Sequence, residues 1–170
     1  AQPFDAAELL AEALRGVMPL AQQRELKLLY DWTGDNPLLM GDEGSLRQVV
    51  TNLLGNALKF TAQGQVSLCA ELRPAGQGHV ALRVQVSDTG PGVPPSMRAR
   101  IFDAFQQGDD SLSRAHGGTG LGLTIAKRLS TAMGGELLLD CPPSGGSTFT
   151  LALRLPLAGV PAASAEAPPA

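Results

Sequence analysis

The sequence contains few aromatic residues, little excess charge and only two cysteines. One tryptophan, one tyrosine and five phenylalanines among 170 residues argue against a surface that stacks nucleic-acid bases. The formal net charge of -3 does not provide the basic surface that binds nucleic acid or an anionic membrane. We therefore expect no nucleic-acid binding and no membrane contact by this domain.

Cys69 and Cys141 lie in apparent strands, without CxxC spacing and without neighbouring metal ligands. This pattern favours two buried thiols in a reducing cytosol. Apolar runs of about 18 residues, the length that a membrane helix needs, are absent. The first residues also lack a signal-peptide pattern. We expect the chain as given to be soluble, while a larger parent protein could carry membrane segments elsewhere.

The overall composition is typical of a globular protein, with 44% hydrophobic and 17% charged residues. The length suits one domain with a substantial core, which we place over residues 1–156. Residues 157–170 are rich in proline and alanine, which is typical of a tail or linker.

The hydrophobic spacing predicts three long helices, over residues 3–26, 42–60 and 121–133. Asp5 is the expected N-cap of the first helix, with Glu8 three residues on. Residues 95–105 also look helical, and 106–118 form a polar, glycine-containing loop. Strands are predicted over residues 27–32, 65–72, 79–88, 136–141 and 147–156. Hairpin-linked strands with grouped helices predict an α+β two-layer sandwich: a mixed, mostly antiparallel sheet of about five strands, with about three helices on one face.

The predicted helix over 42–60 carries an apolar and a polar stripe. The apolar stripe, which should pack on the sheet, contains Leu46, Val50, Leu53, Leu54, Ala57 and Leu58. The polar stripe contains Ser45, Gln48, Asn52, Asn56 and Lys59. A solvated helix face is one interpretation of it. However, asparagine is a poor helix former, and an amide oxygen followed by an ammonium group suits a magnesium ion and a phosphate chain.

The turn "SDTGPGVP" follows a strand rich in β-branched residues. Asp88 either forms an Asx turn or presents a hydrogen-bond acceptor above a pocket. An acceptor there would select adenine, whose exocyclic amine is a donor, over guanine. Gly90 and Gly92 would allow the backbone to approach a flat ring closely.

The stretch "AHGGTGLGLT" places four glycines at the start of a helical pattern. A Walker A loop needs Lys and then Ser or Thr after its last glycine, whereas Gly122 is followed by Leu123 and Thr124. The G-x-G-x-G spacing also differs from the Rossmann fingerprint. Two interpretations stay open: a structural hinge, or a loop that closes on a nucleotide and leads into a helix N-terminus.

Four segments follow one another along the chain in the same order as the sequence motifs of a known protein family. "NLLGNALKFT", "DTGPGV", "IFDAFQQ" and "GGTGLGL" resemble the N, G1, F and G2 boxes of the catalytic ATP-binding domain of bacterial sensor histidine kinases, a member of the GHKL group. "MGGEL" and "GGSTF" follow in the same order, so the likeness runs from about Pro3 to Pro156. It implies the Bergerat-type ATP-binding fold with a mobile ATP lid, and the cofactors ATP and Mg²⁺.

The resemblance also implies roles for individual residues. Asn56 would coordinate magnesium with Asn52 beside it, Lys59 would contact phosphate, and Phe60 would pack near the purine. Asp88 would accept from the adenine amine, with Gly90 and Gly92 shaping the pocket. The lid hinge and its phosphate contacts would comprise Gly118, Thr119, Gly120, Leu121 and Gly122, with Arg114 reaching the terminal phosphates. Catalysis would depend on Asn56, Lys59 and Arg114.

In related ATPases a glutamate prepares water for attack at the position of Asn52, and an asparagine cannot act as that base. The resemblance therefore implies transfer of the γ-phosphoryl group to a histidine rather than hydrolysis, and it disfavours a gyrase-type ATPase. Neither His79 nor His116 has the expected acceptor context, although His116 could contact ATP. The acceptor should lie on a separate dimerisation domain.

The lid sequence further resembles that of hybrid kinases, so a receiver domain or a response regulator is an expected partner. The domain should be cytoplasmic, in a parent anchored in the bacterial inner membrane. The alternative is a regulatory docking module with the same fold and weak or dispensable nucleotide binding. Intact Asn56, Lys59 and Asp88 favour the kinase.

Overall fold

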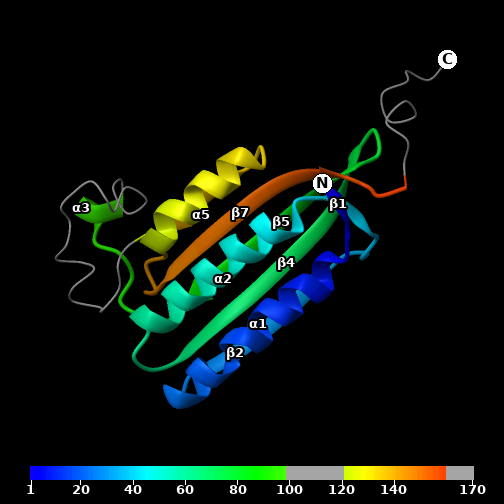
Figure 1. The fold of residues 1–170 in the computed structure, drawn as a ribbon. Coiled ribbons are helices and arrows are strands. Elements are labelled where there is room, and N and C mark those ends of the chain that lie inside the picture. The colour runs from blue at the N-terminus through cyan, green and yellow to red at the C-terminus, as the bar shows by residue number, and fades with distance from the viewer. Residues whose placement is uncertain (99–120, 160–170) are drawn as a thin grey trace.

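The computed structural model describes residues 1–98 and 121–159, in which three helices cover one face of a five-stranded sheet (Figure 1). The sheet has the order β2-β4-β5-β7-β6, with only the β2–β4 pair parallel. Its strands are β2 (Lys27–Thr33), β4 (Gln65–Gly76), β5 (His79–Asp88), β6 (Glu136–Asp140) and β7 (Ser147–Pro156). The covering helices are α1 (Ala6–Gln23), α2 (Glu43–Phe60) and α5 (Leu121–Ala132). The predicted two-layer sandwich is confirmed.

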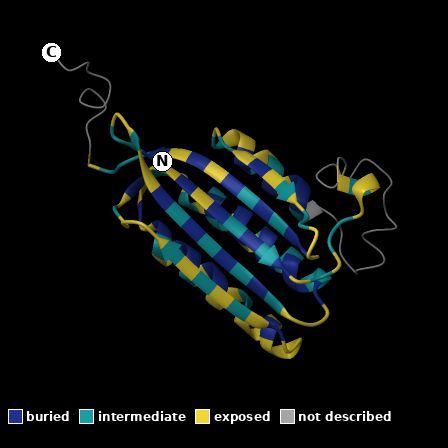
Figure 2. Cartoon of the chain, turned by 180° about the vertical axis from the view of Figure 1, so that it is seen from behind, coloured by how far each residue is buried: buried dark blue, intermediate teal, exposed yellow. Residues whose placement is uncertain are grey.

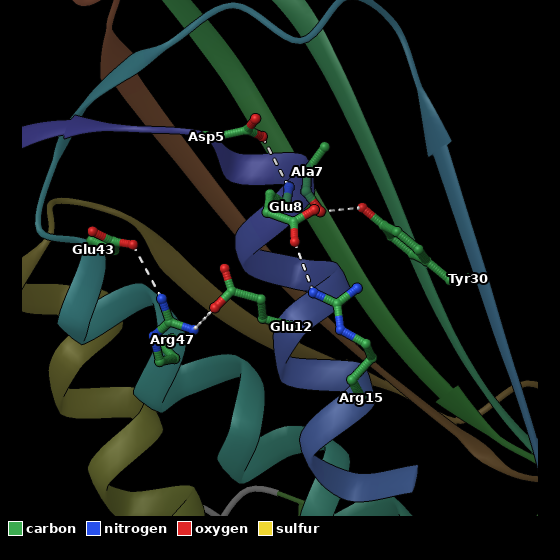
Figure 3. A network of polar contacts seen from close by, with 8 residues as sticks. All are labelled: Asp5, Ala7, Glu8, Glu12, Arg15, Tyr30, Glu43 and Arg47. Carbon is green, nitrogen blue, oxygen red and sulfur yellow. Dashed lines mark hydrogen bonds and ion pairs between the residues drawn. The ribbon is translucent and has the colours of Figure 1, made fainter.

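Each long helix begins or ends at a side chain or glycine that satisfies its terminal backbone groups. Asp5 caps α1 by accepting from the Glu8 amide at 2.9 Å, as the sequence predicts (Figure 3). Asp42 caps α2 by accepting from the amide and the hydroxyl of Ser45, at 3.0 and 2.7 Å. Helix α5 ends at Ala132, and Gly134, two residues later, has the positive φ of 79° that is common after a helix C-terminus.

The core lies between the helices and the sheet, and the burial pattern shows why the sequence folds this way. Side chains along β4, β5 and β7 alternate between buried and more exposed, as Figure 2 shows from the opposite side of the sheet. Every residue of the predicted apolar stripe of α2 is buried, together with Val49. The helix and strand periods therefore direct their apolar side chains into one core.

Several boundaries differ from the prediction. The segment 73–78, expected as a loop, continues β4 to Gly76, with a register shift between Pro74 and Gly76. The hairpin turn is only Gln77-Gly78, both with positive φ, which matches a tight two-residue turn. A small antiparallel sheet of β1 (Gln2–Phe4) and β3 (Leu39–Gly41) was not expected. Such three-residue strands carry too little periodicity to be recognised.

The prediction of two buried thiols is wrong. Cys69 lies in β4 between the buried Leu68 and Ala70, so it points to the face of the sheet that the three helices do not cover, and it is half-buried. Partial burial, with the nearby Asp31 carboxylate, raises the pKa of the Cys69 thiol. Cys141 follows the end of β6 instead of lying within it, and is half-buried too.

The structure tests only part of what was predicted for residues 95–118 and for the end of the chain. Helix α3 (Pro95–Arg98) includes the start of the predicted helix 95–105, while residues 99–105 and the predicted lid loop lie outside the described residues. The boundary between residues 1–156 and 157–170 stays a prediction. Of the helices that the structure describes, none combines the length and the apolar character needed to cross a bilayer.

Candidate functional site

A cavity of about 260 Å³ lies where the C-terminal end of α2 meets the end of β5 and the start of β7. Its lining is mostly apolar, with a few polar groups, as in many small-molecule sites. The lining residues are Asn56, Phe60, Asp88, Pro91, Gly92, Val93, Pro94, Leu123, Ser147 and Phe149. Segments from four parts of the chain thus form one concave site.

Asp88 is the buried charged group of this cavity, with 8% of its surface exposed. Ser147, its register partner on β7, donates from its hydroxyl to Oδ2 at 2.7 Å and from its amide to Oδ1 at 3.3 Å. The Gly90 amide donates to Oδ1 at 2.9 Å. An ionised carboxylate offers about four acceptor positions. Three donors therefore orient Asp88 and leave acceptor capacity for a ligand at the cavity wall.

The glycines of the turn after β5 are required by close backbone packing. A Cβ on Gly90 would lie 2.9 Å from the Phe60 carbonyl oxygen and 3.2 Å from Asp88 Oδ1. Gly92 has a φ of +79°, and a Cβ there would lie 2.9 Å from the Gly146 carbonyl oxygen. Gly92 lines the cavity, so the turn forms part of its wall as backbone.

The polar stripe of α2 divides into two groups. Asn56 lines the cavity, and Phe60 lines it one turn later. Asn52 instead donates from Nδ2 to the Gly122 carbonyl oxygen at 3.2 Å, and its Oδ1 accepts from Gln48 at 3.4 Å. Asn52 therefore connects α2 to the first turn of α5. Lys59 lies in the last turn of α2, half-buried and outside the cavity lining.

The end of α2 is held by an arginine from the end of α1. Arg24 Nη1 donates to the carbonyl oxygens of Leu58 and Lys59, at 3.0 and 3.3 Å. These are among the last carbonyls of the helix, which lack partners within it. The positive guanidinium also suits the negative end of the helix dipole. Arg24 thus orients the turn that carries Lys59 and Phe60.

The structure describes only some of the remaining predicted site residues. Leu121 begins α5, and Gly122 lies in its first turn. Arg114, His116, Gly118, Thr119 and Gly120 lie outside the described residues, so their roles stay predictions. Within the described ranges, no cluster of three or more His, Cys, Asp or Glu side chains could hold a metal ion by itself.

Sequence reasoning missed three residues at the site. Ser147 and Phe149 line the cavity, and Thr61, the C-cap of α2, lies beside Gly90. The segments containing them, "GGSTF" and "LKFT", were recognised as family motifs, but no role was assigned to these positions. Ser147 could be placed opposite Asp88 only with the order and register of β5 and β7, which involve residues 59 positions apart.

The fold and the cavity define a domain that binds a small molecule, and comparison with known proteins identifies the family. Residues 41–158 match the family model described as histidine kinase-, DNA gyrase B- and HSP90-like ATPase. The chain belongs to this family. The recognition made from the four sequence motifs is confirmed.

Relatives of this chain include sensor kinases. The chain is 45% identical over 157 residues to the sensor protein GacS of Pseudomonas syringae, and 39% identical over 156 residues to the histidine-protein kinase BarA of Escherichia coli K12. These alignments cover 92% and 91% of this chain, and 17% of each relative. The chain thus spans about a sixth of the length of these relatives.

The fold also matches a solved structure of a protein in complex with AMPPNP. Full-length ShkA in complex with AMPPNP matches with a TM-score of 0.77 and 38% sequence identity. The match covers 92% of this chain and 31% of the ShkA chain.

Proposed function

We propose that this domain binds Mg-ATP and donates its γ-phosphoryl group to a histidine on a separate dimerisation domain, in two-component signal transduction. The observation that carries the proposal is the placement of Asn56 and the buried Asp88 on one cavity with apolar walls. The family membership and the sensor-kinase relatives support it.

The cavity suits adenine. The orienting hydrogen bonds to Asp88 leave an acceptor that matches the exocyclic amine of adenine, whereas guanine has a carbonyl oxygen at that position. Phe60, Val93 and Phe149 supply apolar contacts for a flat base. Gly92 adds backbone to the wall of this cavity, at a position where its φ of +79° and the nearby Gly146 carbonyl oxygen leave no room for a side chain.

The phosphates and the metal would be held on the α2 side of the base. Asn56 would provide an amide oxygen to Mg²⁺, which typically takes one or two protein ligands together with substrate phosphates. This fits the absence of a preformed cluster of metal ligands among the described residues. Bound magnesium neutralises charge on the phosphates during transfer. We further propose that Lys59 contacts phosphate, that Arg114 reaches the terminal phosphates, and that Gly118, Thr119, Gly120, Leu121 and Gly122 form the lid hinge.

Asn52 favours transfer over hydrolysis. An amide has no basic site for activating water, and both ends of this amide are engaged, with Gly122 and Gln48. The γ-phosphoryl group would therefore persist until a histidine is presented. His79 is an unsuitable acceptor, because it begins β5 and its Nδ1 lies 2.9 Å from the Gln77 carbonyl oxygen.

The acceptor domain would belong to the longer parent protein, and a receiver domain or response regulator would take the phosphoryl group next. We propose a cytoplasmic location for this domain, within a hybrid kinase anchored in the inner membrane. The short coverage of the relatives supports a multidomain parent.

The test is calorimetric titration of a non-hydrolysable ATP analogue, with and without Mg²⁺. Wild type should bind more tightly with Mg²⁺. Asn56→Ala should lose about tenfold or more of that magnesium-dependent affinity, because the amide ligand is removed. The control is Asn36→Ala, since Asn36 is exposed and contacts Asp5 rather than the cavity. Absence of magnesium-dependent binding by wild type would refute the proposal.

A further inference from the structure

Strand β2 forms an open edge of the sheet. It pairs with β4 on one side, and the described part of the chain contributes no strand to its other side. The Lys27 amide donates to the Gly64 carbonyl oxygen, on the β4 side, at 3.1 Å. Because alternate residues of a paired strand direct their backbone groups to opposite sides, Leu28, Tyr30 and Trp32 direct theirs away from the sheet. This edge is therefore able to accept a further strand.

The side chains on one face of β2 form a pattern that is complementary to itself. Leu29 is 44% exposed, and Lys27 and Asp31 lie two residues before and after it on the same face. Asp31 is the register partner of Cys69, so this is the face that the helices leave uncovered. Lys27 and Asp31 are exposed, and neither forms an ion pair with another described residue. An exposed leucine midway between a cation and an anion matches a second, reversed copy of the same strand.

The backbone of β2 allows the register that uses this match. A twofold axis at Leu29 places Leu29 opposite its own copy, and Lys27 opposite Asp31 of the second copy. Leu28 then lies opposite Tyr30 of the second copy, and since both have outward-directed backbone groups, they exchange both of their hydrogen bonds. Lys27 and Asp31 fall at a non-hydrogen-bonded pair, where side chains are closest. Moving the axis to a neighbouring residue would align Lys27 with an uncharged side chain instead.

The opposite edge of the sheet, β6, lacks this complementarity. Its central residue, Leu138, is 53% exposed. The residues two positions before and after it are Glu136 and Asp140, so pairing with a reversed copy would set carboxylates against each other. In addition, Lys127 Nζ donates to the Leu137 carbonyl oxygen of this strand at 3.2 Å. The charge patterns therefore favour self-pairing at β2 and oppose it at β6.

We propose that the β2 edge is an interaction surface for a second copy of this chain, with the two β2 strands paired antiparallel about a twofold axis at Leu29. The two five-stranded sheets then form one continuous sheet, with both helix layers on the same face. The Tyr30 hydroxyl donates to the Ala7 carbonyl oxygen of α1 at 2.9 Å, which places this side of α1 over β2 (Figure 3). Ala11 follows one turn later on the same side, so short side chains lie where the two α1 helices face each other.

The association is weak in the isolated chain, because the paired segment is much shorter than a standard interface. A dimerisation domain in the parent protein, as proposed above, would hold two copies at an effective concentration of about 1 mM, at which a weak pairing is populated. The pairing itself uses no residue of the candidate nucleotide site.

The test is sedimentation equilibrium of this chain without nucleotide, at concentrations up to about 1 mM. Wild type should show a reversible monomer–dimer equilibrium. Lys27→Asp and Asp31→Lys should each weaken it about tenfold, because both ion pairs across the axis become like-charge pairs. The double exchange Lys27→Asp/Asp31→Lys restores opposite charges and should return the dissociation constant to within about threefold of wild type. The matched control is Arg83→Asp, an equal change of charge at an exposed position of the central strand β5, which should have no effect.

Disulfide trapping tests the register directly. With Cys69 and Cys141 replaced by serine, Leu29→Cys should form a covalent dimer on mild oxidation, because facing residues at a non-hydrogen-bonded pair have Cα atoms about 4.5 Å apart, which a disulfide spans. Leu138→Cys, at the centre of β6, should react about tenfold more slowly, since only random collisions bring its copies together.

Equal trapping rates at positions 29 and 138 would overturn the inference, as would a wild type that stays monomeric at every concentration. A dimer that the single charge reversals leave unchanged would also overturn it, because another surface would then be responsible. These measurements involve no nucleotide, so their failure leaves the proposed function intact.

Discussion

The two ends of α2 satisfy the same backbone requirement in different surroundings. At the N-terminal end, Asp42 caps the helix, and Arg47 bridges Glu43 and Glu12 at 3.1 and 3.2 Å on the surface (Figure 3). At the C-terminal end, Arg24 binds the last carbonyls, and Phe60, the last residue of the helix, lines the cavity. Polar groups at the first end are solvated, whereas the second end borders the cavity that contains the buried carboxylate of Asp88.

This difference separates structural from functional polar residues more clearly than residue type does. Exposed ion pairs typically contribute about 0–1 kcal/mol, because water and salt screen them. A buried group such as Asp88 is costly without its donors, so a protein that retains it must orient it. Three donors converging on one carboxylate beside a cavity therefore point to ligand binding, while the Arg47 pairs indicate only helix packing.

The largest effect in this comparison should come from Asp88→Asn. The amide places a donor where the carboxylate accepts, opposing either the Ser147 hydroxyl or the adenine amine. Affinity for the ATP analogue should fall about 100-fold or more, as expected when a buried charged acceptor is lost. Calorimetric titration measures it. Asp140→Asn is the matched control, because Asp140 ends β6, which β7 separates from β5, in an exposed position. An equal loss of affinity for guanine nucleotides would contradict the assigned role.

An intermediate effect should come from the two arginines at the ends of α2. Arg24→Met should lower the free energy of unfolding by about 1–2 kcal/mol, since two helix-end carbonyls lose a charged donor. It should also weaken nucleotide binding by shifting Lys59 and Phe60. Arg47→Met should cost at most about 1 kcal/mol and leave nucleotide affinity unchanged. Urea unfolding and titration measure both. Equal effects of the two substitutions on affinity would remove the distinction between the ends.

The same contrast explains what could be predicted from the sequence. The core face of α2 follows from local periodicity, so the helix was placed correctly to within a residue at each end, although its caps were not predicted. The strands β5 and β7 were also recognised. The length of β4 and the small β1–β3 sheet depend on pairing between distant segments, which local patterns do not reveal.

The candidate site was predicted in part for the same reason. Asn56, Phe60, Asp88 and Gly92 lie in recognisable motifs, and the structure brings them to one cavity. Ser147 is a serine whose importance depends on its proximity to Asp88, which only the fold creates. Arg24 is 34 positions from the Leu58 carbonyl that it binds, so its role could not be read locally.

The smallest effect should come from Asp42→Asn, and it should depend on pH. Hydrogen bonds from the Ser45 amide and hydroxyl hold the pKa of the Asp42 carboxyl below its ordinary value of 3.8. The ionised cap therefore stabilises the fold above about pH 4, and this contribution is lost as the pH falls through the folded-state pKa. Asparagine still accepts from the Ser45 amide but does not titrate. The melting temperature of wild type should exceed that of Asp42→Asn by a small margin at neutral pH, and the margin should close on acidification. Asp5, whose pKa is also lowered, is present in both proteins and cancels in the difference. A margin that stays constant or widens below pH 4 would show that the charge of Asp42 does not contribute, and nucleotide affinity should be unchanged throughout.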